Sequence, residues 1–112
     1  MPDVESIAAK RGLPADFEAK ASEAAGLLRA MSNERRLLIL CRLGAGECSV
    51  GAMQKDIGVS QSALSQHLAI LRADGLVATR RDAQTVYYRI ADPAALRVID
   101  TLASIYCPEM LT

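Results

Sequence analysis

Residues 49–77, SVGAMQKDIGVSQSALSQHLAILRADGLV, decide the fold, because their spacing predicts two short helices joined by a tight turn. Val50, Met53 and Ile57 stand at i, i+3 and i+7, on one face of a first helix. Gly58 is suited to end that helix, since a residue without Cβ turns the chain at low cost. Ser60 is a good N-cap for the second helix, because its hydroxyl accepts a bond from an unpaired amide of the first turn.

The second helix has one apolar face and one polar face. Leu64, Leu68 and Leu71 form the apolar face, at i, i+4 and i+7. The other face carries side chains of the types that hydrogen-bond base edges and phosphates: Gln61, Ser62, Ser65, Gln66 and Arg72. In a helix-turn-helix the residues near the start of the second helix enter the major groove. A solvated helix of an ordinary helical hairpin has the same pattern, so the two helices alone leave both interpretations open.

Residues 77–90 predict a β-hairpin directly after the helix pair. Apolar and β-branched residues alternate on both sides of a turn near Asp82–Ala83. The hairpin carries three arginines, two at its tip and one on its return strand: Arg80, Arg81 and Arg89. A helix pair followed by a basic hairpin indicates a mainly α (α+β) fold, a winged helix-turn-helix with a two-stranded β-wing and a helical dimer interface.

Composition supports a single globular domain. The chain has 112 residues, of which 51% are hydrophobic and 23% charged. The net charge of +0 argues against indiscriminate coating of nucleic acid, but residues 60–90 carry a net +2 and residues 91–112 a net −2, counted from Arg, Asp and Glu. The positive charge therefore lies around the helix pair and the wing, where a phosphate backbone would lie. With no long apolar run and no signal-peptide pattern, we expect a cytoplasmic protein with no membrane contact.

The remaining segments predict helices on either side of this unit. We expect residues 1–15 to form a flexible N-terminal arm, residues 16–107 the DNA-binding and dimerisation domain, and residues 108–112 a C-terminal tail. A stripe at two residues per heptad begins the domain and indicates a subunit interface or packing on the chain's own core: Phe17, Ala21, Ala24, Leu28 and Met31.

Two further helices are predicted. Ser32 or Asn33 caps a helix that is apolar on nearly all sides, which is typical of a buried central helix: Leu37, Leu38, Leu40 and Cys41. The last helix begins at Asp92–Pro93 and ends at Cys107, before Pro108. Its apolar stripe predicts packing beside residues 16–31, in a helical layer formed by two chains.

Three strings resemble the ArsR family of bacterial winged-helix repressors: LRAMSNERRLLILCRL, the helix-pair segment, and RRDAQTVYYRI. The resemblance covers about residues 17–107. It implies a homodimer that holds double-stranded operator DNA and is released by an inducer. The wing departs from the family in having Ala83 and Gln84 where Gly and Arg are frequent, so we expect fewer phosphate contacts and a shallower salt dependence.

No metal site of the family is visible. Its Cys-x-Cys positions align with Ser49 and Gly51, and His67, the single histidine, lies on the recognition helix. A zinc site needs about four N, S or O ligands. We therefore expect no metal and no cofactor, and interpret His67 as a DNA-facing or surface residue.

Cys41 and Cys107 are placed as in the sulfide- and persulfide-responsive branch of the family, the BigR and SqrR type. The resemblance implies that persulfides or polysulfides link this pair through sulfur atoms and that DNA affinity then falls. From the residues alone, packing is the better explanation of each cysteine taken singly, and the resemblance reverses this for the pair. Cys48 lies outside the two-cysteine pattern and is treated as incidental.

Three alternatives remain open at this stage. A repressor of the same family that senses a metal ion or a general oxidant differs only in its inducer. A small thiol sulfurtransferase is disfavoured, because no cysteine stands beside a general base and no Cys-x-x-Cys motif is present, and we expect no catalytic residues. A helical interaction protein that never touches DNA is the third.

Overall fold

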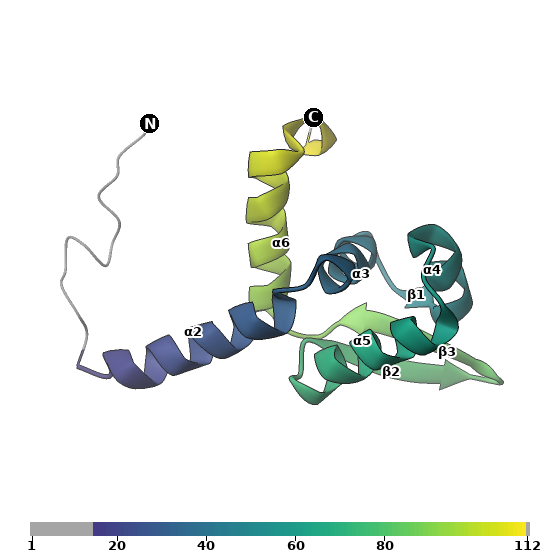
Figure 1. Cartoon of the computed structure of the whole chain (residues 1–112), viewed down its shortest axis with the longest axis horizontal. Coiled ribbons are helices and arrows are strands. Elements are labelled where there is room, and N and C mark those ends of the chain that lie inside the picture. The colour runs from purple at the N-terminus through teal and green to yellow at the C-terminus, as the bar shows by residue number, and fades with distance from the viewer. Residues whose placement is uncertain (1–14, 112) are drawn as a thin grey trace.

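The computed structural model describes residues 15–111, and it is mainly helical with a small antiparallel sheet (Figure 1). The expected arm falls on residues 1–15, nearly all outside the described range. In chain order the elements are α2 Phe17–Met31, α3 Glu34–Gly44, β1 Cys48–Ser49, α4 Val50–Ile57, α5 Gln61–Ala73, β2 Val77–Asp82, β3 Thr85–Ile90, α6 Pro93–Tyr106 and the 3₁₀ turn η1 Pro108–Leu111. The expected winged helix-turn-helix is thus confirmed.

The core forms where α3 meets the helix pair α4–α5, the sheet and α6. Its largest fully buried side chains are Ile39, Leu40, Met53, Leu64, Leu68 and Leu71. The apolar face predicted for the recognition helix α5 is therefore confirmed. Within residues 15–111 no helix is long and apolar enough to cross a membrane.

The helices begin and end at the predicted signals. Asn33 Oδ1 accepts hydrogen bonds from the amides of Arg35 and Arg36, at 2.9 and 3.1 Å. Asp92 Oδ1 accepts from the amide of Ala94 at 2.9 Å, with Pro93 in the first helical position. Gly58 ends α4 in the left-handed conformation, with φ 74°. These local signals fix the element boundaries without help from tertiary contacts.

The sheet has a third strand that sequence reasoning missed. Its order is β1-β3-β2, all antiparallel, with Cys48 opposite Tyr88 in β3. Strand β1 is only two residues long, so no alternation exists from which to predict it. The wing turn occupies Ala83–Gln84, one residue later than expected.

One packing expectation was wrong. Helix α3 is not buried on all sides, because Cys41 is exposed and Leu38 is 44% exposed, while Ile39, Leu40 and Leu43 face the core. Within one chain α6 packs on α3. The expected packing of α6 beside residues 16–31 in a layer of two chains stays a prediction. Figure 1 shows that α2 and α6 leave the core in different directions, and α2 contacts α3 and α5.

The apolar stripe of α2 is buried at its C-terminal end, but its large side chains before that end are exposed. Met31 is buried in the core. Phe17 and Leu28 remain 40% and 55% exposed. Within one chain, most of the stripe therefore has no apolar covering, which favours the subunit-interface interpretation.

Ala83 has φ +57°, a left-handed conformation that costs a residue with a Cβ about 1 kcal/mol. We predict that Ala83→Gly stabilises the protein by about 0.5–1 kcal/mol, since the relief of strain exceeds the added unfolded-state entropy. Urea unfolding at one fixed protein concentration measures this. The matched control, Ala78→Gly inside β2, should destabilise, and a loss of stability in both variants would contradict the prediction.

Candidate nucleic-acid interface and thiol pair

The start of α5 is held by its cap. Ser60 Oγ accepts a hydrogen bond from the amide of Ala63 at 3.1 Å and lies 3.3 Å from Ser62 Oγ. With Gly58 turning the chain, this cap fixes the first turn of α5 against α4. The polar side chains predicted for this face are all exposed: Gln61, Ser62, Ser65, Gln66 and Arg72.

A groove of about 610 Å³ lies between this first turn and the wing. Its polar lining is uncharged and includes Gln54 of α4, Gln61 and Ser65 of α5, and Gln84 and Thr85 of the wing. Amide and hydroxyl groups of this kind both donate and accept hydrogen bonds, as base edges require. Sequence reasoning missed Gln54, whose position on the groove-facing side of α4 depends on the long-range placement of the wing.

His67 is only half-buried and lies at the edge of the apolar face of α5. Its Nδ1 is 3.5 Å from Nη1 of Arg36, which belongs to the first turn of α3. The spacing explains this position, because residue 67 falls three residues after Leu64 and four before Leu71. His67 therefore contacts α3, unlike the fully exposed Gln66 beside it.

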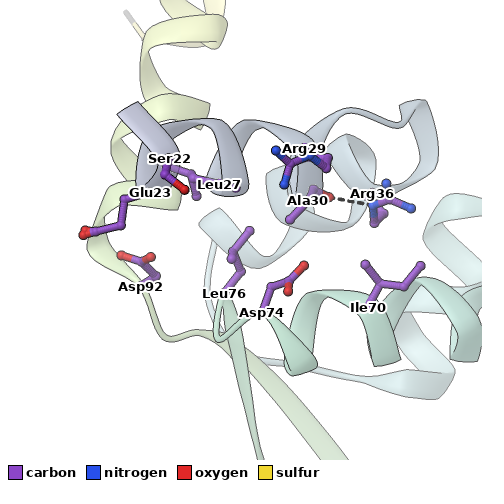
Figure 2. Close-up of a pocket in the computed structure, with 11 residues that line it drawn as sticks. Ser22, Glu23, Leu27, Arg29, Ala30, Arg36, Ile70, Asp74, Leu76 and Asp92 are labelled. Atoms are coloured by element: carbon purple, nitrogen blue, oxygen red, sulfur yellow. Dashed lines mark hydrogen bonds between the residues drawn. The ribbon is translucent and has the colours of Figure 1, made fainter. Parts of the chain in front are cut away.

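Arg36 also binds the end of α2. Its Nε donates to the carbonyl of Ala30 at 2.6 Å (Figure 2). Next to this bond a cavity of about 560 Å³ separates α2 from the end of α5. Figure 2 shows carboxylates and arginines around it, among them Glu23, Asp74 and Arg29. Within the described residues no group of three His, Cys, Asp or Glu side chains could hold a metal ion.

The arginines of the wing differ in their surroundings. Strand register places Arg80 opposite Tyr87 and Arg81 opposite Val86, so their side chains leave opposite faces of the sheet. Val86 and Tyr88 line the groove beside α5, which puts Arg81 on the groove side. Arg89, Arg81 and Arg72 are exposed.

Arg80 is engaged in an ion pair. Its Nε lies 3.0 and 2.8 Å from the two carboxylate oxygens of Glu47, and its Nη2 donates to Oε1 at 2.7 Å. Its guanidinium carbon sits 4.4 Å from the ring centre of Tyr87. The hydrogen bond lowers the pKa of Glu47 and raises the pKa of Arg80. From the sequence, Arg80 was expected to contact DNA. Its ion pair with Glu47, 33 residues earlier in the chain, was not predicted.

Helix α6, which packs on α3, places Cys107 near enough to Cys41 for its charge to influence the pKa of Cys41. Cys41 is exposed on α3, and Cys107 is the half-buried C-cap residue of α6. The pKa of Cys41 is raised, first by desolvation and then by the negative charge of a Cys107 thiolate. Arg42, which could have lowered that pKa, instead donates to Asp56 at 2.8 Å.

Cys48 has different surroundings. It is buried at the start of β1, where its thiol donates to the carbonyl of Ser49 at 3.4 Å. Tyr88 lies opposite it in β3. A buried thiol in a strand pair is typical of a packing residue.

Comparison with known proteins gives one family. The model of bacterial regulatory proteins of the arsR family matches residues 33–79. The nodulation protein NolR of Rhizobium meliloti is 52% identical over 84% of this chain and 77% of its own length. The transcriptional activator HlyU of Vibrio cholerae is 50% identical over 82% of this chain and 85% of its own length.

Solved structures agree in fold. The transcriptional repressor BigR from Xylella fastidiosa superposes with a TM-score of 0.78 at 40% identity, covering 82% of this chain and 94% of that one. A homodimeric winged helix-turn-helix DNA-binding domain from Mycobacterium bovis superposes with a TM-score of 0.70 at 33% identity, covering 90% and 93%. Both likenesses extend well beyond the helix pair.

The Ser60 cap should matter for the whole domain. We predict that Ser60→Ala destabilises the protein by about 1 kcal/mol, because the Ala63 amide loses its acceptor. Ser65→Ala is the control, since it removes an exposed hydroxyl from the same helix, one turn away from the cap. Chemical unfolding of both variants measures the difference, and equal midpoints would show that the cap contributes nothing.

Proposed function

This chain belongs to the ArsR family of bacterial regulatory proteins, and we propose that it is a dimeric repressor that reactive sulfur species release from its operator. Its family and its relatives are DNA-binding transcriptional regulators and not enzymes. The inducer acts by linking Cys41 to Cys107. The observation that carries this proposal is the packing of α6 on α3, which places Cys107 near enough to Cys41 for its charge to raise the pKa of Cys41.

The DNA surface is the first turn of α5 together with the wing. The exposed side chains Gln61, Ser62, Ser65 and Gln66 read base edges in the major groove. Arg72 and Arg81 bind phosphates, and this small number gives a modest salt dependence. Arg89 is exposed on the sheet face that carries Arg80, because it pairs with Ala78, so it is not among the groove-side contacts. His67 supports α5 from the side of α3 through Arg36.

The thiol chemistry needs only a persulfide donor, RSSH. The Cys41 thiolate takes the outer sulfur to give Cys41–S–SH and RS⁻, and the same transfer converts Cys107. The terminal sulfur of one persulfide then attacks the inner sulfur of the other, expels HS⁻ and leaves a trisulfide. Attack of an unmodified Cys107 thiolate on Cys41–S–SH gives a disulfide and HS⁻ instead. A direct disulfide requires Cα atoms within about 7 Å, whereas an inserted sulfur extends that reach.

The bridge would act on DNA binding through the dimer. It ties α6 to α3, and α3 packs on both helices of the recognition pair. Two recognition helices must fit half-sites about 34 Å apart. Even a small shift of α6 against α3 changes that spacing.

The dimer itself would use the apolar surface left open on α2 and α6. Phe17 and Leu28 of α2 are exposed, and so are Leu96, Ile105 and Tyr106 of α6. A structural relative is a homodimer. The surface carried by the two helices is therefore the proposed subunit interface.

Leu28→Lys should dissociate the dimer, since it puts a charge into the centre of this interface. Sedimentation equilibrium should then give a monomer, with DNA binding reduced more than tenfold because one half-site alone is held (about 1.4 kcal/mol per factor of ten). Ser22→Lys adds the same charge on another face of α2 and should remain dimeric. A dimeric Leu28→Lys protein would refute this interface.

The sulfur mechanism is tested by intact-mass analysis with operator-binding anisotropy. Glutathione persulfide should add whole sulfur atoms, link Cys41 to Cys107 and weaken DNA binding of the wild type. Cys41→Ser and Cys107→Ser should keep full DNA affinity under the same treatment, whereas Cys48→Ser should respond like the wild type. Because the pKa of Cys41 is raised, its modification should accelerate as pH rises past the value of a free thiol.

Other outcomes identify the alternatives. Equal linkage by peroxide points to a general oxidant sensor, and release by a metal ion at unchanged mass points to a metal sensor. Catalytic turnover of the sulfur donor would indicate a sulfurtransferase. BigR is a repressor by name and HlyU an activator, so a reporter gene beside the bound site gives the direction of control.

A further inference from the structure

We infer that Glu47 and Arg80 form a brace between the wing and the entry to the helix pair, and that Arg80 is therefore a positioning residue for operator binding and not a phosphate contact. The inference rests on the proposed operator binding by the wing. It departs from the sequence-based expectation that all three wing arginines bind DNA.

The contact has the geometry of a fixed pair. Both carboxylate oxygens of Glu47 are used, by two different nitrogens of Arg80, at 2.7 to 3.0 Å. A forked pair of this kind fixes direction as well as distance. Isolated surface ion pairs usually contribute little, but here the guanidinium also stacks on Tyr87.

The pair spans all three strands. Arg80 belongs to β2, and Tyr87, directly opposite it, belongs to the central strand β3. Tyr87 is in turn opposite Ser49 of β1, and Glu47 stands just before β1. The Arg80 side chain therefore crosses the ring of Tyr87 to reach the far edge of the sheet.

The far edge of the sheet is also the start of the helix pair. Ser49 is both the last residue of β1 and the N-cap of α4, whose Ala52 amide it binds at 3.2 Å. A two-residue strand is a short attachment for a hairpin that must keep a fixed angle to α5. The Glu47–Arg80 contact adds a second attachment on the outer face of the sheet, beside the pairing of Ser49 with Tyr87.

The same contact removes Arg80 from the charges available to DNA. Glu47 neutralises it, and strand register directs it to the face opposite the groove. Arg81, its neighbour, leaves the sheet on the groove side. Replacement of Arg80 and replacement of Arg81 should therefore have different effects on DNA binding.

Salt dependence separates a brace from a phosphate contact. Anisotropy titrations on a labelled duplex, selected from random DNA by the full-length protein, are run across a range of KCl concentrations. Arg80→Gln and Glu47→Gln should each weaken binding several-fold by similar amounts, with the slope of log K against log [salt] unchanged. Arg81→Gln, the matched control, should reduce that slope by about 0.9.

Two further variants test geometry against charge. Arg80→Lys keeps the charge but loses the fork, so a brace predicts weaker binding, whereas a phosphate contact would be nearly preserved. The charge swap Glu47→Arg with Arg80→Glu restores an ion pair and should recover part of the affinity. Thermal unfolding of every variant confirms that it is folded.

The brace is overturned if Arg80→Gln lowers the salt slope as Arg81→Gln does, or if Glu47→Gln strengthens binding. If the wild type binds no duplex, the proposed operator binding is refuted. The brace is then tested on its own by amide hydrogen exchange in the free protein. Exchange along β3 should then be faster in Glu47→Gln and Arg80→Gln than in Arg81→Gln. Equal exchange in the three variants would overturn it.

Discussion

The rest of the structure depends on the packing of α3, which has two sides with different tasks. Its inner side places Ile39, Leu40 and Leu43 in the core against the helix pair, the sheet and α6. Its outer side leaves Leu38 and Cys41 accessible. Because protein interiors are close-packed, a displacement of α6 along α3 is passed on to α4 and α5 and is not absorbed. A chemical change at the outer side of one helix can in this way reach the DNA surface.

Polar interactions in this fold are concentrated at its surface. Among the described residues the buried side chains are all apolar, and no buried side-chain polar atom lacks a partner. Apolar burial therefore holds the elements together, while capping bonds and ion pairs set their directions. Arg36 sets the direction of α2 relative to α5, and Glu47 sets that of the wing. Each direction depends on a contact between segments that are distant in sequence or belong to different elements.

The difference between local signals and contacts that join separate elements explains which features could be predicted from the sequence. Caps at Asn33, Ser60 and Asp92 and the leucines of α5 were predictable, because their signals lie within one helix turn or one helical face. The pairing of Glu47 with Arg80 was not, because it joins residues 33 positions apart and depends on β1. The exposure of Cys41 was mispredicted for another reason. A helix that is apolar on all sides has the same sequence pattern whether its second side meets its own core or another chain.

The raised pKa of Cys41 bears on how a thiol pair at this place could choose its inducer. A thiol that is mostly protonated at neutral pH reacts slowly as a nucleophile, so simple exposure does not make Cys41 a general oxidant trap. Its neighbour Cys107 contributes to that shift, because two adjacent thiolates repel. Selectivity would then lie in the second step, where the geometry between α3 and α6 decides which sulfur bridge can close.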